Sequence, residues 1–154
     1  MTTKGSATTG QAPPGHAIVG YVAALEAMRP DTVESVLALC ADDIRFTDPF
    51  NDVTGRPALK AVFDDMFEKV SDLEFMVRDC HGEDRRWLLS WTYSGRLGRL
   101  GAMTIEGMSI VELDADNLVR RHADFWDSGD LYARIPVLGP VIRAIRRRLA
   151  APAG

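Results

Sequence analysis

Residues 37–52 read "LALCADDIRFTDPFND", and this stretch takes the chain from helix to sheet. From Ile44 onward alternate residues face opposite ways, so Asp48 shares a face with Ile44 and Phe46. A carboxylate on the apolar face of a strand has two explanations. Asp48 is a functional acid in a cavity, or it caps backbone amides in the Asp-Pro turn that follows.

Helical periodicity surrounds this strand. Apolar residues recur every three or four positions over 16–28, 33–40 and 59–70, which predicts three helices. The period then changes to two, which predicts strands over 73–77, 87–93, 102–113 and 118–127, separated by turns and Gly-rich connections. Helices followed by a meander of antiparallel strands predict one α+β domain over 15–130, with a disordered lead over 1–14 and a tail over 131–154.

A curved antiparallel sheet wrapped on helices has two different faces. One face encloses a cavity, and the other must be covered by something else. We therefore expect a homodimer that forms through the outer face of the sheet.

The composition is that of an ordinary globular domain, with 154 residues, 46% hydrophobic and 26% charged. The formal net charge of -4 argues against nucleic acid as a partner, because phosphate binding relies on a basic surface. The two cysteines, Cys40 and Cys80, lie in apolar patterns without metal-ligand spacing, so we expect free thiols and no metal. The chain shows no signal-peptide core and no membrane-spanning segment, and we expect a cytoplasmic protein.

The final strand carries three functional side chains on one face. His122, Asp124 and Trp126 alternate there with residues that face the other way, and the same alternation includes Leu118 and Arg120. If this face lines a cavity, His122 and Asp124 are candidates for proton transfer, because imidazole titrates near neutrality and an apolar pocket raises a carboxyl pKa toward it. The alternative is a solvated or interfacial face.

Two further strands supply a wall for such a cavity. The candidate substrate-binding residues there are Trp87, Trp91, Tyr93, Ile105, Gly107 and Ser109. Phe50 and Phe63 are the candidates from outside the sheet. For each aromatic residue the alternative is ordinary core packing. Gly107 is expected to leave a gap in the lining.

Three segments of the chain together resemble a known superfamily. They are "YVAALEAM" (21–28), "LALCADDIRFTDPFND" (37–52) and "GRPALKAVFDDMF" (55–67), and they are similar to the opening of the NTF2-like superfamily, in particular its ketosteroid isomerase and SnoaL-like branches. The residues at matching places are Ala41, Asp42, Asp43, Asp48, Pro49, Phe50 and Gly55. The resemblance extends over about residues 16–130.

This resemblance implies a cone-shaped fold with a pocket between sheet and helices. It also implies that Asp48 is a general base and that Tyr21 lies on the helix that carries the isomerases' oxyanion tyrosine, although an ungapped alignment offers Ala24 instead. Ser109 stands where the isomerases have a protonated aspartate. A serine can donate a hydrogen bond, but it stabilises a dienolate less well than a protonated aspartate does.

A second relative is suggested by "RRHADFWDSGDLY" (120–132), which resembles a strand of the limonene epoxide hydrolases. Their catalytic acid maps onto Asp124. Those hydrolases also need an Arg-x-Asp pair on the preceding strand, where this chain has "LSWTYSG" (89–95). The resemblance therefore favours other chemistry over hydrolysis.

The C-terminal segment mixes apolar residues with an arginine cluster, Arg143, Arg146, Arg147 and Arg148. This amphipathic pattern fits a cover over the pocket, a partner surface or an anionic membrane. The simplest interpretation is a solvated helix whose basic end suits the helix dipole, and we do not expect membrane contact.

The sequence thus predicts a cofactor-independent isomerase, cyclase or hydrolase acting on a small hydrophobic molecule such as a steroid, polyketide or terpenoid. Asp48 and Asp124 would be the acid and base, His122 would tune or relay the proton of Asp124, and Tyr21 completes the catalytic set. The rival interpretation is a non-catalytic module that binds a small molecule or assembles with other chains.

Overall fold

The structure is a computed structural model that describes residues 13–151. The predicted lead over 1–14 lies outside this range except for Pro13 and Pro14, as do the last three residues of the predicted tail. The helices are α1 (Pro14–Glu26), α2 (Val33–Leu37), α3 (Arg56–Lys69), α4 (Ser128–Tyr132) and α5 (Leu138–Leu149), with a 3-10 turn η1 (Gly98–Leu100). The strands are β1 (Cys40–Thr47), β2 (Asp52–Thr54), β3 (Val70–Glu83), β4 (Arg86–Leu97), β5 (Gly101–Leu113) and β6 (Val119–Trp126).

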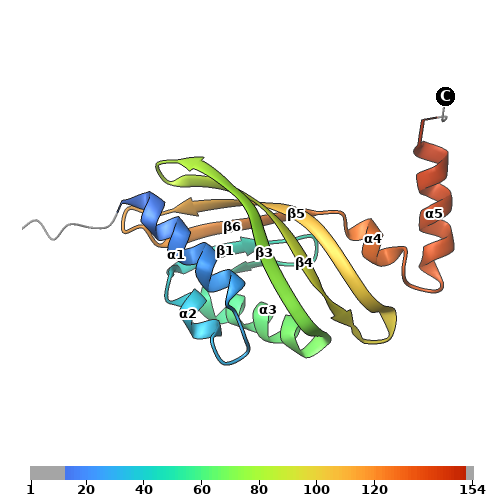
Figure 1. Ribbon diagram of the computed structural model, residues 1–154, viewed down its shortest axis with the longest axis horizontal. Helices are drawn as coiled ribbons and strands as arrows, with labels where there is room; N and C mark the ends of the chain where they lie inside the picture. Colours follow the sequence, from blue (N-terminus) through green and yellow to red (C-terminus); the bar gives the residue numbers. More distant parts are fainter. Residues whose placement is uncertain (1–12, 152–154) are drawn as a thin grey trace, which may run out of the picture.

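The described strands form a single six-stranded sheet in the order β2-β1-β6-β5-β4-β3. Figure 1 shows the sheet strongly curved, with α1, α2 and α3 gathered on one face. The core lies between these layers, where Ile18, Tyr21 and Leu59 from the helices meet Leu89 and Val111 from the sheet. This arrangement confirms the predicted α+β class and single domain, because helices pack on one face of the sheet rather than between parallel strands.

One strand pair differs from the predicted antiparallel meander. β1 pairs with β6 in parallel, with Phe46 opposite His122 and Thr47 opposite Ala123. A parallel pair needs a long crossover, and here nearly the whole domain lies between the two strands. Because the strands run in the same direction, Asp48 and Asp124 follow at the same end of the pair.

A β-bulge near the start of β6 changes which side chains face inward. Leu113 pairs with Val119 while Glu112 pairs with Arg121, so Arg120 is an extra residue without a partner on β5. Val119 is therefore buried and Arg120 is exposed. The prediction that Leu118 and Arg120 share a face with His122 is therefore wrong, because the bulge lies between them. Beyond the bulge, the predicted alternation from His122 to Trp126 holds.

Three short elements were not predicted: β2, α4 and the turn η1 in the Gly-rich connection. The segment read as a turn contains β2, whose residues pair with β1 from Arg45 to Thr47, and the Arg45 guanidinium binds the Asp52 carboxylate at 2.9–3.0 Å. The strand has only three residues and a polar composition, so it lacks the alternation that identifies longer strands. α4 follows β6 at Asp127, whose carboxylate accepts a hydrogen bond from the Gly129 backbone as an N-cap.

None of the helices in residues 13–151 has the length and apolar character needed to cross a bilayer.

Candidate functional site

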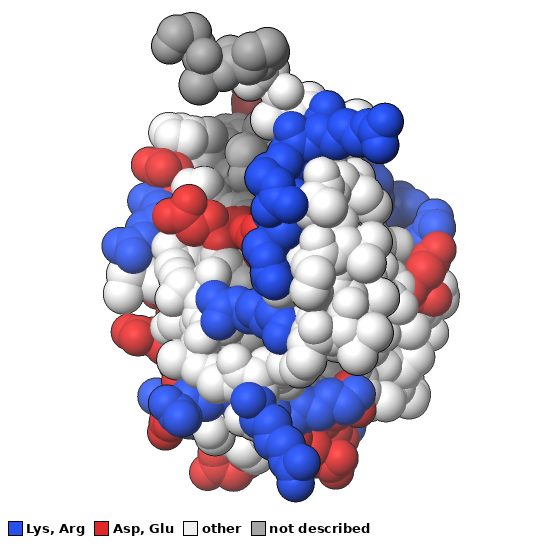
Figure 2. All heavy atoms as spheres, turned by 90° about the vertical axis from the view of Figure 1, so that its right-hand side faces the viewer, with Lys and Arg blue, Asp and Glu red and all other residues white. Residues whose placement is uncertain are grey.

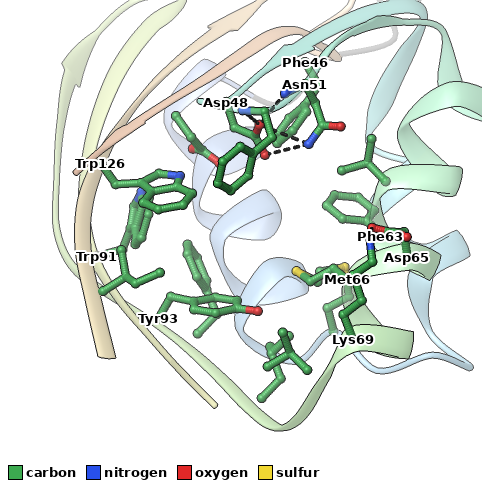
Figure 3. Close-up of a pocket in the computed structure, with 18 of the residues that line it drawn as sticks. Phe46, Asp48, Asn51, Phe63, Asp65, Met66, Lys69, Trp91, Tyr93 and Trp126 are labelled. Atoms are coloured by element: carbon green, nitrogen blue, oxygen red, sulfur yellow. Dashed lines mark hydrogen bonds and ion pairs between the residues drawn. The ribbon is translucent and has the colours of Figure 1, made fainter. Parts of the chain in front are cut away.

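A cavity of about 410 Å³ lies between the inner face of the sheet and the helices. Its size is in the range typical of sites for small organic ligands. Figure 3 shows its aromatic side chains converging from both layers, with Trp91, Tyr93 and Trp126 opposite Phe63 and Met66. The predicted site residues that line it are Asp48, Phe50, Phe63, Trp91, Tyr93, Ile105, His122, Asp124 and Trp126.

The two carboxylates of greatest interest thus face one cavity, Asp124 from β6 and Asp48 from the position directly after the neighbouring strand β1. Asp124 lies on β6 between two aromatic neighbours in the lining, His122 and Trp126. The strand's two-residue period explains why these three side chains point the same way.

Asp124 is held by a buried hydrogen-bond network. Its Oδ1 lies 2.7 Å from Nε2 of His122 and 2.5 Å from Oγ of Ser109. The Trp91 indole N–H in turn donates to Ser109 Oγ at 2.7 Å, so the serine hydroxyl hydrogen is directed toward the carboxylate. Among the described residues no side chain or backbone group donates to Oδ2 of Asp124, and the side chain keeps 20% exposure. One oxygen is thus fixed and the other is free for a ligand.

Tyr21 supports this network from behind. Its hydroxyl lies 2.8 Å from Nδ1 of His122, and the tyrosine is only 1% exposed. Burial, followed by the Coulomb effect of nearby Cys40, raises the pKa of Tyr21 well above its usual value, so the phenol stays protonated and donates its O–H. A neutral His122 with its hydrogen on Nε2 satisfies both contacts, because Nδ1 then accepts from Tyr21 and Nε2–H donates to Asp124.

Asp48 has a different environment, although it lies beside Asp124 at the same end of the β1–β6 pair. Its Oδ1 accepts hydrogen bonds from the backbone N–H groups of Phe50 and Asn51 at 2.7 and 2.6 Å. The side-chain amide of Asn51 reaches both carboxylate oxygens at 3.0 Å, as the dashed lines of Figure 3 show. The hydrogen bonds of Asp48 are therefore those expected of a turn residue, and its side chain also lines the cavity.

Four predicted site residues lie outside the cavity lining: Tyr21, Trp87, Ser109 and Gly107. Tyr21 and Ser109 are buried behind the lining, where Tyr21 binds His122 and Ser109 binds Asp124 and Trp91. Trp87 lies further along β4, where its indole donates to the Asp84 carbonyl oxygen. Gly107 leaves no gap for a ligand, because the ring of Trp91 packs directly on it and a Cβ there would collide with the indole.

The lining also contains charged and polar groups that the sequence did not single out. Lys69 and Asp65, on the last turns of α3, form an ion pair of 2.7 Å at the cavity wall. Their spacing of four residues is a signal for an ion pair but not for a cavity, since it occurs on many solvated helix faces.

Burial raises the pKa of Tyr93 to about 12, so its phenol remains a hydrogen-bond donor at neutral pH.

Aromatic rings connect the cavity with the C-terminal helices. Phe50 packs edge-on against Trp126 with ring centroids 5.3 Å apart, and against Tyr132 of α4 at 6.1 Å. Phe50 is 53% exposed and also lines the cavity, as does Leu131 of α4. α4 therefore lies beside the opening of the cavity.

Comparisons with known proteins agree with this geometry. The family model described as SnoaL-like domain matches residues 18–122. An NTF2-like protein of unknown function from Burkholderia pseudomallei K96243 superimposes with a TM-score of 0.69 at 13% identity, covering 81% of this chain and 98% of that one. No curated protein matches the chain.

Two other solved structures carry functional names. A candidate SnoaL-like polyketide cyclase from Shewanella denitrificans OS-217 superimposes with a TM-score of 0.66 at 15% identity, covering 80% of this chain and 97% of that one. The Δ5-3-ketosteroid isomerase from Mycobacterium sp. superimposes with a TM-score of 0.60 at 18% identity, covering 75% and 95%. At these identities the likeness shows the fold alone, and the predicted NTF2-like cone is confirmed.

Proposed function

The chain belongs to the SnoaL-like domain family, and on that premise we propose that it is a cofactor-independent enzyme that transfers a proton on a small hydrophobic molecule. The observation that carries this proposal is the state of Asp124. One carboxylate oxygen is anchored by Ser109 and His122, while the other is unoccupied by protein donors and belongs to the wall of an apolar cavity. A fixed carboxylate with one free oxygen is suited to general acid–base catalysis.

The proposed step begins at a C–H bond next to a carbonyl group of the substrate. Oδ2 of Asp124 takes the proton, and the electron pair of the C–H bond moves toward the carbonyl oxygen to form an enolate. Tyr93, a phenol that stays protonated, supports this charge as a hydrogen-bond donor from the same lining. Where the substrate also has a C=C bond next to the reacting carbon, the enolate is a dienolate, and return of the proton from Asp124 to the far carbon of that bond completes an isomerisation. Attack of the enolate carbon on a second carbonyl of the same molecule gives an alkoxide, which takes the proton back from Asp124 and completes a cyclisation.

His122 and Asp48 have distinct parts in this proposal. Nε2–H of His122 holds Asp124 in place and stabilises its negative charge before the proton arrives. Asp48 is the second carboxylate of the cavity, beside Asp124 at the end of the β1–β6 pair, and it is the candidate to receive or return a proton at a neighbouring atom of the substrate. Hydrolysis of epoxides is not favoured, because residues 89–95 contain no Arg-x-Asp pair.

A binding module without catalysis is the second candidate function. The observation in its favour is that both oxygens of Asp48 already accept hydrogen bonds within its own turn. In that case the cavity has only one available carboxylate, and the network around Asp124 serves to complete a polar patch in the core.

Deuterium exchange distinguishes the two candidates. The probes are a β,γ-unsaturated 3-ketosteroid, an aromatic β-keto ester and a cyclic terpenoid ketone, incubated with the full chain in D₂O, with C–H exchange followed by NMR. We expect Asp124→Asn to lower enzyme-dependent exchange about 100-fold or more, and Asp48→Asn to lower it about tenfold. Quenching of tryptophan fluorescence measures probe binding, which should change less than about threefold.

Asp65→Asn is the matched control, because Asp65 is an exposed carboxylate of the same wall and pairs with Lys69. It should leave exchange unchanged. Exchange that survives both Asp124→Asn and Asp48→Asn would exclude the proposed mechanism. Probes that bind without any exchange above the solvent background would favour the binding module.

We further propose that two copies pair through the outer face of the sheet. Met108 of β5 and Phe125 of β6 are opposite each other in the strand register and are 52% and 55% exposed. Leu88 on β4 is 44% exposed on a neighbouring strand. Neighbouring exposed apolar side chains of this kind mark interaction surfaces. A cytoplasmic location remains part of this proposal, supported by the free thiols Cys40 and Cys80.

A further inference from the structure

α5 is attached to α4 by one side only. Gly139 packs on the Ala133 carbonyl so closely that a Cβ would collide with it. Arg143 donates to that same carbonyl oxygen at 2.9 Å, and Arg146 binds Asp130 at 2.6 Å and also Asp127. At 3.6 residues per turn, the side that faces α4 therefore contains a glycine and two arginines.

The apolar stripe of α5 points away from this attachment. Four apolar residues recur at spacings of three and four and are exposed: Leu138 (45%), Val141 (55%), Ile145 (49%) and Leu149 (81%). A fifth, Ile142, is half-buried. An amphipathic helix of a globular domain normally turns its apolar stripe toward the core. Here the charged side contacts the body and the apolar stripe is turned outward. Figure 1 shows α5 projecting from the end of the molecule, beyond α4.

All the charged residues of α5 are positive. Its 12 residues include four arginines and no acidic residue, although the whole chain has a net charge of -4. Within the described residues Arg146 has carboxylate partners, whereas Arg147 and Arg148 form no ion pair. Figure 2 views this end of the molecule and shows basic side chains running beside an uncharged strip. The exposed apolar stripe and the uncompensated positive charge are thus side by side.

We propose that α5 is an interfacial helix that binds a membrane surface rich in anionic phospholipids. The outward stripe would enter the boundary between headgroups and acyl chains, and the arginines beside it would contact lipid phosphates. This differs from the expectation of a solvated helix, because the sequence shows the amphipathic pattern but not which side faces the body. Contact of this kind is peripheral and needs no membrane-spanning segment.

Other occupants match these features less well. Nucleic acid would use the arginines but offers no apolar counterpart for Val141 and Ile145. A second copy joined along the stripes would bring two sets of arginines together, which like-charge repulsion opposes. A cover over the cavity would require breaking the contacts of Arg146 with Asp127 and Asp130. Of these four occupants, the anionic lipid surface is the one that complements both the stripe and the charge.

The position of α5 connects membrane binding with the cavity. α4 links the two, since Leu131 lines the cavity and Tyr132 packs on Phe50 at its opening. A hydrophobic substrate would then enter from the bilayer rather than from water. Entry of the substrate from the bilayer depends on the proposed function, whereas lipid binding by α5 does not.

Vesicle flotation of the full chain tests the proposal. The vesicles contain either phosphatidylcholine alone or phosphatidylcholine mixed with phosphatidylglycerol. We expect binding to the mixed vesicles to exceed binding to phosphatidylcholine at least about tenfold and to weaken as salt is raised. Arg147→Gln with Arg148→Gln should weaken binding about 30-fold, because each basic residue near an anionic surface contributes a factor of about five.

A second variant tests the apolar stripe without changing charge. Val141→Gln with Ile145→Gln should weaken binding to mixed vesicles at least about tenfold, because both side chains are exposed apolar surface. The matched controls are Val19→Gln, which removes a valine that is 66% exposed on α1, and Arg99→Gln, which removes an exposed arginine of the β4–β5 connection. Both controls should float like the unchanged protein.

Three results would overturn the proposal. The first is no flotation with mixed vesicles, and the second is binding that depends on the arginines alone and is matched by duplex DNA. The third is self-association that the Val141→Gln and Ile145→Gln pair dissolves, which would assign the stripe to a second copy. Asp124→Asn should float normally, so loss of lipid binding and loss of proton exchange are independent outcomes.

Discussion

The hydrogen bond between Tyr21 and His122 provides a sharp test of the buried network. Tyr21→Phe removes the hydroxyl without changing the packing of the ring, which is 1% exposed. Nδ1 of His122 then has no donor in a region that excludes water, since the His122 side chain is only 5% exposed. Leaving a buried polar atom unsatisfied costs about 1–3 kcal/mol of folding free energy.

The expected loss is measurable in two ways. In urea denaturation we expect the free energy of unfolding to fall by about 2 kcal/mol, and the melting temperature by about 4–8 °C for a domain of this size. ¹⁵N NMR should show a changed Nδ1 resonance of His122, because that nitrogen no longer accepts a hydrogen bond. Because the chemical shift of Nδ1 reports on that nitrogen directly, it distinguishes loss of the hydrogen bond from a general loss of packing.

Tyr132→Phe is the matched control for this substitution. Tyr132 packs on Phe50, and among the described residues its hydroxyl has no hydrogen-bond partner. Its loss should change stability by less than about 0.5 kcal/mol. If Tyr21→Phe is equally harmless and the Nδ1 resonance does not move, Tyr21 does not support His122 and the proposed orientation of Asp124 loses its anchor.

Three further predictions concern the core, the cavity wall and the outer face. Burial raises the pKa of Cys40 from 9.0 to about 11, so the folded state holds the thiol proton more tightly than the unfolded chain does. The resulting contribution to the free energy of unfolding is fully present below about pH 9 and is lost as the pH rises through 11. Denaturant unfolding should show an alkaline decline of up to about 3 kcal/mol that Cys40→Ala reduces, and an unchanged decline would contradict the assignment. Gly107→Ala should destabilise by about 1–3 kcal/mol and shift tryptophan fluorescence, since the new methyl group collides with the indole packed on it, whereas Gly20→Ala has open space and should be neutral or stabilising. Phe125→Glu should convert a dimer into monomers in light-scattering measurements and Val19→Glu should not; a protein that is monomeric before substitution would refute the pairing proposal.

Local patterns were sufficient to predict the faces of the long strands. On β4 and β5 the alternation of apolar and polar residues holds over many positions, and it placed Trp91, Tyr93 and Ile105 on the inner face, where they line the cavity. The bulge at Arg120 was not predictable in this way. It depends on which residues of β5 pair with β6, and one extra residue reverses the two-residue period without any change in composition.

For Gly107 the sequence predicted which way the residue faces but not what it contacts. The sequence correctly placed it on the inner face of β5, but its partner across the strands is Trp91, whose ring fills the space above it. The gap predicted from a small residue is therefore closed by a large neighbour. Cross-strand pairing decides such cases, and a single sequence does not contain it explicitly.

The two carboxylates of the cavity show why a shared pocket does not imply a shared role. Asp48 follows the last residue of β1 and begins a tight turn, so its nearest donors are the backbone amides of that turn and the side-chain amide of Asn51. These donors occupy both carboxylate oxygens of Asp48. Asp124 lies within β6, where the backbone hydrogen bonds are already used by the sheet, so its side chain meets only side-chain donors. Because those donors, His122 and Ser109, both bind Oδ1, Oδ2 remains free of protein donors. The chemistry we propose thus depends on Asp124 lying within a strand and Asp48 in a turn, and Asp124→Asn should therefore have the larger effect on proton exchange.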